Sequence, residues 1–225
     1  MTSALRIPAP CGGDRRTLLV MLPGLNMSAQ DFVAQGFVAA AHERHEPLDI
    51  VALQAGSSDY FDGTFMTPLH DTIVAPARAE GYARVVLLGV SLGAMGALLY
   101  ARAHPEDADG IVLLAPFLGT PGTIVAVERA GGLVQWEPGP IGSNELERGL
   151  LAWLKAHCAR QPQKPWIVLG YGTEDRFRDG AGLLAAALPP DHVVARPGSH
   201  EAATWLALWR IILDQDPVKG SGDGT

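Results

Sequence analysis

The stretch Val85-Val86-Leu87-Leu88-Gly89-Val90-Ser91-Leu92-Gly93-Ala94-Met95-Gly96 decides how this chain folds. Its first half is a run of aliphatic residues, which is typical of a buried strand. Its second half is rich in small and apolar residues and predicts a helix. Between them stands G-x-S-x-G, which in a strand–turn–helix context marks a serine exposed at the apex of a sharp turn. The glycines on either side of Ser91 fit this reading, because larger side chains there would collide with the strand and the helix.

Similar aliphatic runs occur on both sides of this stretch and alternate with helical patterns. Most of them lack polar alternation, which suits strands covered on both faces. Strands separated by helices predict right-handed crossover units. We therefore expect an α/β fold with a mostly parallel sheet of about six strands, flanked by helices on both faces. The predicted strands are 17–22, 48–53, 85–90, 111–115, 166–170 and 192–195.

Helix boundaries are marked by capping residues and by proline. Ser28 precedes the first helical pattern as an N-cap, Gly81 follows the second as a C-cap, and Pro105 ends the third. The predicted helices are 29–44, 69–80, 91–104, 144–159, 180–188 and 202–213.

Composition excludes several classes of protein. The chain has 225 residues, 48% of them hydrophobic, and a net charge of -7, which argues for one globular domain and against nucleic-acid binding. Residues 1–218 are expected to form that domain and 219–225 a flexible tail.

No stretch is long and apolar enough for a transmembrane helix, and the first residues lack the apolar core of a signal peptide, so a cytoplasmic location is expected. Cys11 and Cys158 are expected to be unpaired thiols, and no Cys/His cluster suggests a metal.

Two connections are too long for simple turns. Residues 54–68 and 116–143 both leave the carboxyl ends of predicted strands, the edge at which open α/β sheets bind ligands. We expect them to form the walls of a pocket, with 116–160 making a small cap. Aromatic residues in or beside these loops either line an apolar pocket or anchor the loops; they are Tyr60, Phe61, Phe65, Phe117 and Trp136.

An acid and a histidine follow Ser91 in the chain, and together they supply the groups that nucleophilic serine catalysis needs. Asp175 comes directly after the predicted strand 166–170, and His200 comes after the last predicted strand. Both therefore lie at the same sheet edge as Ser91. A histidine that takes the serine proton, oriented by a carboxylate, makes the serine a nucleophile. Glu174 is the alternative acid.

These motifs resemble those of the α/β-hydrolase superfamily, in particular its small bacterial serine esterases. The resemblance covers about residues 17–213. It is carried by Leu22-Pro23-Gly24-Leu25-Asn26, Gly89 to Gly96, Leu113-Leu114-Ala115-Pro116, Gly172-Thr173-Glu174-Asp175 and Pro197-Gly198-Ser199-His200.

The resemblance implies a role for each matching residue. Ser91 would be the nucleophile, Asp175 the acid and His200 the base. The main-chain N–H groups of Leu25 and Leu92 would form the oxyanion hole, with Asn26 as a neighbouring candidate. The implied activity is hydrolysis of a small carboxylic ester without cofactor or metal.

The chain departs from the pattern of the superfamily in two places. Many relatives carry His-Gly where this chain has Pro23-Gly24, which puts the conformation of the oxyanion loop in question. The segment before the first predicted strand is short, so the antiparallel strands that often begin this fold are expected to be reduced or absent.

Other functions stay open on the sequence alone. The same three residues would serve a thioesterase, a lysophospholipase or an acyltransferase. A non-catalytic binding protein on a hydrolase scaffold is an alternative of another class. The expected partner is a small-molecule ester or thioester, with no nucleic acid and no membrane segment, and the sequence does not indicate the oligomeric state. A role for His70 in the site is a minor alternative.

Overall fold

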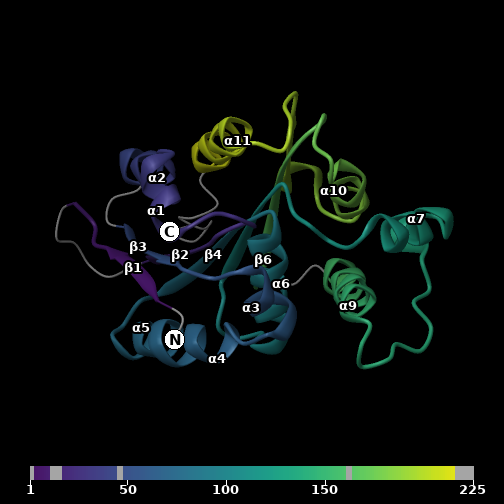
Figure 1. Cartoon of the computed structure of the whole chain (residues 1–225), viewed down its shortest axis with the longest axis horizontal. Coiled ribbons are helices and arrows are strands. Elements are labelled where there is room, and N and C mark those ends of the chain that lie inside the picture. Colours follow the sequence, from purple (N-terminus) through teal and green to yellow (C-terminus); the bar gives the residue numbers. More distant parts are fainter. Residues whose placement is uncertain (1–2, 11–16, 45–47, 161–163, 216–225) are drawn as a thin grey trace, which may run out of the picture.

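One seven-stranded sheet forms the centre of the molecule in the computed structural model, which describes residues 3–10, 17–44, 48–160 and 164–215 (Figure 1). The strand order is β1-β3-β2-β4-β5-β6-β7. From β3 to β7 neighbouring strands are parallel, with Val20 opposite Leu87 and Leu88 opposite Val112. This confirms the predicted α/β class and its six parallel strands. The strands are β1 (Ala4–Ile7), β2 (Thr17–Leu22), β3 (Leu48–Leu53), β4 (Arg84–Val90), β5 (Gly110–Leu114), β6 (Trp166–Gly172) and β7 (Val193–Arg196).

The antiparallel part of the sheet is reduced to one short strand. β1 pairs with β3 at the sheet edge, from Ala4 opposite Leu53 to Ile7 opposite Ile50. The sequence does not mark this strand, because its four residues carry no apolar run. Its burial alternates between exposed and half-buried, as expected for an edge strand.

Helices cover both faces of the sheet (Figure 1). Two adjoining residues of a strand serve opposite faces: Leu87 belongs to the core under one helical layer and Leu88 to the core under the other. This is why the central strands read as continuous aliphatic runs. On one face lie α1 (Ala29–Ala34), α2 (Phe37–Arg44) and α11 (Ala202–Asp214).

The other face carries the remaining helices. They are α3 (Ser57–Asp62), α4 (Met66–Leu69), the π-helical η1 (His70–Val74), α5 (Ala75–Ala79), α6 (Leu92–Ala103), α7 (Pro121–Arg129), α8 (Gly132–Gln135), α9 (Leu146–Arg160) and α10 (Arg178–Ala185); a short 3-10 turn, η2 (Pro190–His192), leads into β7. No helix within the described residues is long and apolar enough to cross a membrane.

The predicted helix 29–44 is wrong as a single element. It is interrupted at Gly36, whose φ of 87° lies in the left-handed region, and splits into α1 and α2. Ser28 begins α1 as expected: its main-chain N–H and its hydroxyl both donate to the Asp31 carboxylate, at 2.7 and 2.8 Å. The predicted helix 69–80 is one continuous helical stretch over 66–79, in which the π-helical η1 joins α4 to α5.

The connection after β5 contains two helices that the sequence does not mark. α7 and α8 pack against each other and against α10, and α8 also packs against α9. α9 lies against α6, which follows the nucleophile motif. The cap proposed for 116–160 stays a prediction, and the predicted tail 219–225 lies outside the described residues, as does Cys11. Cys158 is buried and free.

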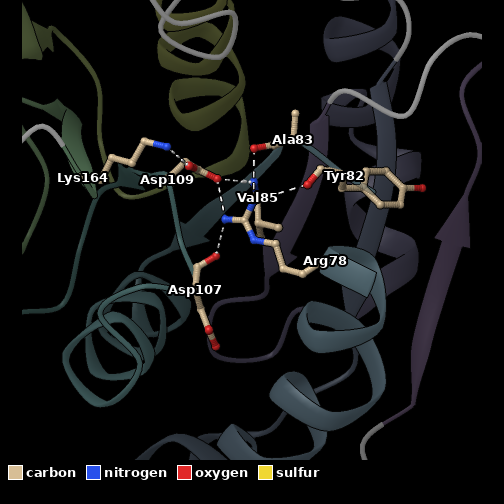
Figure 2. A network of polar contacts seen from close by, with 7 residues as sticks. All are labelled: Arg78, Tyr82, Ala83, Val85, Asp107, Asp109 and Lys164. Atoms are coloured by element: carbon tan, nitrogen blue, oxygen red, sulfur yellow. Dashed lines mark hydrogen bonds and ion pairs between the residues drawn. The ribbon is translucent and has the colours of Figure 1, made fainter. Parts of the chain in front are cut away.

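At the amino ends of the strands, Asp109 ties several elements together (Figure 2). Its side chain is almost fully buried and accepts hydrogen bonds from the Val85 N–H, Arg78 and Lys164, at 2.8, 2.6 and 2.6 Å. Arg78 also donates to the carbonyl oxygen of Asp107. This network lies at the amino ends of the strands, whereas Ser91 lies at their carboxyl ends.

Candidate active site

Ser91 occupies a strained turn between β4 and α6. Its φ of 53° and ψ of -113° are rare for a residue with a side chain. A Cβ on Gly89 would lie 2.4 Å from main-chain atoms of Gly93 and Ala94, and one on Gly93 would lie 2.2 Å from the carbonyl oxygen of Leu22. Both positions therefore require glycine. The Ser91 N–H donates to Leu114 at the end of β5, and its carbonyl oxygen accepts from the Phe117 N–H, so the turn is fixed to the next strand.

Ser91, His200 and Asp175 lie in one hydrogen-bonded row. The Oγ of Ser91 is 3.0 Å from Nε2 of His200, and Nδ1 of His200 is 2.7 Å from Oδ2 of Asp175. These contacts fit a neutral imidazole that donates its Nδ1–H to the carboxylate and accepts the serine proton at Nε2. Ser91 follows β4, Asp175 follows β6 and His200 follows β7, so three strand ends at one sheet edge supply the three groups. Asp175, not the adjacent and exposed Glu174, contacts His200.

The loop that carries Asp175 is held from several sides. Asp175 is fully buried, and its other oxygen, Oδ1, accepts the Phe177 N–H at 2.8 Å. The Glu174 N–H donates to the carbonyl oxygen of Gly198, in the loop before His200. A Cβ on Gly172 would lie 2.1 Å from that same Gly198 oxygen. Gly172 therefore allows the acid loop and the histidine loop to touch.

Two aromatic rings enclose the imidazole of His200. Phe177 and Trp205 each lie with their ring centroid 4.9 Å from that of His200, at interplanar angles of 84° and 77°. Both contacts are edge-to-face, which is a favoured arrangement for aromatic pairs. They restrict rotation of the imidazole, so that Nε2 stays directed at Ser91.

The loop after β2 lies directly against Ser91. A Cβ on Gly24 would be 3.2 Å from the Cβ of Ser91. The carbonyl oxygen of Gly24 accepts the Met27 N–H at 3.1 Å, and Asn26 in this turn has a φ of 63°. Because the peptide bond is trans, this turn directs the Leu25 N–H away from Met27.

Two main-chain N–H groups near the serine have no acceptor. In the described part of the chain, neither the Leu25 N–H nor the Leu92 N–H makes a hydrogen bond. Leu92 begins α6, where the first N–H groups have no partner within the helix and the helix dipole is positive. Asn26, the neighbouring candidate, is exposed. The arrangement can stabilise negative charge next to Ser91.

Tyr60 holds the loop after β2 in place. Its ring is buried and packs over Gly96 of α6, where a Cβ would lie 2.4 Å from the ring. Its hydroxyl donates to the carbonyl oxygen of Pro23 at 2.9 Å. Burial, with a smaller effect of Asp59, raises the pKa of Tyr60 well above its usual value, so the hydroxyl keeps its proton.

His70 lies away from this site. It meets Tyr100, His104 and Asp107 at the amino edge of the sheet, where Nδ1 of His70 is 2.8 Å from Oδ2 of Asp107 and the Tyr100 hydroxyl is 2.6 Å from that oxygen. Burial acts to raise the pKa of Asp107, but the hydrogen bonds from Tyr100 and His70 lower it overall.

The chemical types of His70, His104 and Asp107 would suit a metal ion, and their ligand atoms lie within 4.8 Å of one another. The two imidazoles, however, stack with centroids 4.7 Å apart and planes at 14°. Nitrogen lone pairs lie in the ring plane, so lone pairs of two stacked parallel rings do not converge on one ion. The arrangement is that of a hydrogen-bonded network.

Sequence reasoning did not assign Phe177 and Trp205 to the surroundings of the histidine. Phe177 stands two residues after the predicted acid, and this closeness in the sequence was the one indication that its ring could lie near the histidine. The contact of Tyr60 with Pro23 joins residues 37 positions apart, so the sequence indicates Tyr60 only as an aromatic residue of the loop.

Comparison with known proteins gives a family and a fold. A sequence model described as "Putative esterase" matches residues 32–205. The chain is 28% identical over 152 residues to the proline iminopeptidase of Neisseria meningitidis serogroup B, covering 60% of this chain and 47% of that protein. The chain thus spans about half the length of this relative.

Solved structures match over almost the whole chain. The fluorophosphonate-binding serine hydrolase FphF of Staphylococcus aureus has a TM-score of 0.64 at 13% identity, covering 95% of this chain and 97% of its own. The monoacylglycerol lipase of Paleococcus ferrophilus has a TM-score of 0.61 at 14% identity, covering 96% and 100%. At these identities the likeness establishes the α/β-hydrolase fold.

Proposed function

The chain belongs to the esterase family, and from this premise we propose that it hydrolyses a small carboxylic ester through an acyl-Ser91 intermediate. The observation that carries the proposal is the hydrogen-bonded row from Asp175 through His200 to Ser91. Near Ser91, the N–H groups of Leu25 and Leu92 have no acceptor among the described residues. We assign Ser91 as nucleophile, His200 as general base and acid, and Asp175 as the group that orients the imidazole.

Acylation begins with attack of the Ser91 oxygen on the ester carbonyl carbon. His200 takes the serine proton at Nε2, and the carbonyl electron pair moves to its oxygen. The N–H groups of Leu25 and Leu92 donate to this oxyanion; one such donor typically lowers the barrier by about 2.7–4 kcal/mol. The tetrahedral species then collapses, the bond to the alcohol oxygen breaks, and His200 returns its proton to that oxygen.

Deacylation repeats these steps with water. A water molecule attacks the acyl carbon while His200 removes its proton. The same two N–H groups hold the second oxyanion. The bond between the acyl carbon and the Ser91 oxygen then breaks. The acid product leaves and Ser91 regains its proton. Asp175 stabilises the imidazolium in both halves of the reaction.

The test is hydrolysis of nitrophenyl esters from acetyl to palmitoyl by the wild type and Ser91→Ala. Removing the nucleophile is expected to lower kcat by about 10⁴-fold or more. Ser3→Ala, at an exposed serine just before the edge strand β1, is the matched control and is expected to keep wild-type activity. A fluorophosphonate probe is expected to label the wild type and not Ser91→Ala. Undiminished hydrolysis by Ser91→Ala would contradict the proposal.

A further inference from the structure

Three phenylalanine rings form a row that leads from His200 to the surface. Phe177 touches His200, Phe117 touches Phe177 and Phe61 touches Phe117, with centroid separations of 4.9, 5.3 and 6.4 Å. All three contacts are edge-to-face, at 84°, 71° and 76°. The rings come from three connections at the carboxyl edge of the sheet: α3, the loop after β5 and the loop before α10. We call Phe61, Phe117 and Phe177 the phenylalanine row.

The phenylalanine row runs from the margin of the core to the surface. Phe61 is 48% exposed, and Phe117 and Phe177 are partly buried, with Phe117 packed against the core. Partly exposed aromatic side chains that contact one another beside a polar site are typical of ligand-binding surfaces. The guanidinium of Arg176 lies over the Phe177 ring, 4.8 Å from its centroid, so it contacts that ring as well.

Main-chain hydrogen bonds fix the row relative to Ser91. The N–H of Phe117 donates to the carbonyl oxygen of Ser91 at 3.1 Å, and the N–H of Phe177 donates to Oδ1 of Asp175 at 2.8 Å. Two of the three rings therefore belong to residues whose main-chain N–H groups are hydrogen-bonded to Ser91 or Asp175. A substrate group on the row would stand at a set distance from the ester carbon.

We propose that the phenylalanine row is a binding subsite for an aromatic group of the substrate. This inference rests on the proposed ester hydrolysis for its position in the reaction. Rings that already meet edge-to-face leave faces and edges on which a further aromatic ring can continue the same arrangement. A saturated ring of equal size gains the burial of apolar surface but not this electrostatic fit.

The aromatic group belongs either to the acyl half or to the alcohol half of the ester. His200 must protonate the alcohol oxygen, the acyl carbon is bonded to Ser91, and the row begins at Phe177, whose ring contacts His200. Matched pairs of an aromatic and a saturated ester show which half of the substrate lies on the row. Ethyl phenylacetate against ethyl cyclohexylacetate tests the acyl half, and benzyl acetate against cyclohexylmethyl acetate tests the alcohol half.

We expect one of these pairs to show a preference for the aromatic member of about tenfold in kcat/KM, the order of one favourable aromatic contact. The double variant Phe61→Leu/Phe117→Leu keeps apolar side chains and main-chain bonds but removes two rings, and its preference is expected to fall close to one. Val33→Ala, at an exposed apolar residue of α1, is the control and is expected to retain the preference. Equal rates within both pairs, or a preference that survives in the double variant, would overturn the subsite.

A binding measurement separates this inference from the proposed hydrolysis. N-benzylacetamide and N-cyclohexylmethylacetamide represent the alcohol half, and N-ethyl-2-phenylacetamide and N-ethyl-2-cyclohexylacetamide represent the acyl half. Each pair is titrated into Ser91→Ala protein, with and without Phe61→Leu/Phe117→Leu. Tighter binding of the aromatic member of one pair that is lost in the triple variant supports the subsite even if no ester is hydrolysed. Equal binding within both pairs to Ser91→Ala would overturn it, whatever the activity of the wild type.

Discussion

Tyr60 lies next to the serine turn and holds the loop that follows β2. Pro23 in that loop offers no side-chain hydrogen bond of its own. The Tyr60 hydroxyl instead binds the Pro23 carbonyl oxygen, and its ring fills the space that Gly96 leaves. One residue from α3 thus holds the loop that presents the Leu25 N–H.

We expect Tyr60→Phe to lower kcat for ester hydrolysis about tenfold with little change in KM. The variant leaves the Pro23 carbonyl oxygen without its partner, and loosened placement of the proposed oxyanion donor, the Leu25 N–H, would affect the transition state more than substrate binding. Steady-state kinetics with a nitrophenyl ester measure both constants. The expected loss of stability is about 1–2 kcal/mol.

Tyr100→Phe is the matched control for this variant. It also removes a hydroxyl from a buried ring, but that hydroxyl binds Asp107 at the opposite edge of the sheet. It is expected to lose similar stability and keep kcat. Equal kcat in Tyr60→Phe and the wild type would show that the loop is held without the Tyr60 hydroxyl.

At the scale of elements, the π-helical turn η1 has a cause in the sequence. Pro76, in the first turn of α5, has no N–H and cannot bind the carbonyl oxygen of Thr72, four residues earlier. Arg6 of β1 donates to that oxygen instead, at 2.8 Å. The missing helical bond is thus replaced by a bond to the edge strand, and the helix widens before the proline.

We expect Arg6→Ala to lower the free energy of unfolding by about 1 kcal/mol, the usual value of one hydrogen bond. In a Pro76→Ala background the same substitution is expected to cost close to nothing, because the alanine N–H can satisfy Thr72. Urea unfolding of the four proteins gives this coupling as a double-mutant cycle. Equal costs of Arg6→Ala in both backgrounds would mean that the proline does not create the need for Arg6.

At the scale of the whole molecule, Asp109 joins elements that are distant in the sequence. It connects α5 through Arg78, β4 through the Val85 N–H and the segment before β6 through Lys164 (Figure 2). Burial acts to raise the pKa of Asp109, but the hydrogen bonds from Lys164, Val85 and Arg78 outweigh it and lower the pKa below its usual value.

We expect Asp109→Asn to lower the free energy of unfolding by about 2 kcal/mol at pH 7, because hydrogen bonds to a charged group are lost. The depressed pKa means that the unfolded chain binds the proton more readily than the folded one. The carboxylate therefore stabilises the fold above the pKa of an unfolded aspartate, about 3.9, and this stabilisation is lost as the pH falls below it.

The difference between wild type and Asp109→Asn should consequently shrink as the pH falls below about 4. Urea unfolding at pH 7 and at acidic pH measures it. Asp179→Asn, at an exposed carboxylate, is the control and is expected to change stability little. A difference that stays constant with pH would contradict the assigned cause.

The regular part of the fold could be predicted from the sequence. Continuous aliphatic runs predicted β2 and β3 with their observed bounds, and the order of strands and helices predicted a parallel sheet. These features are local, because a run of apolar residues must be buried wherever it occurs. The turn at Gly36, the π-helical turn before Pro76 and the four-residue β1 were missed. Gly36 and Pro76 are single residues inside longer helical patterns, and β1 is a strand only through its pairing with β3.

The sequence by itself determined the α/β class, the serine turn, and the candidates Ser91, Asp175 and His200, because each follows a strand whose end is set by a local pattern. Only the tertiary structure decided that Asp175 and not Glu174 contacts His200, that Tyr60 holds the Pro23 loop, and that a row of three phenylalanines extends from the histidine. These facts depend on side-chain direction and on contacts between distant segments. Such contacts arise only when the sheet brings the strand ends together, and no pattern in one segment records its neighbours in space.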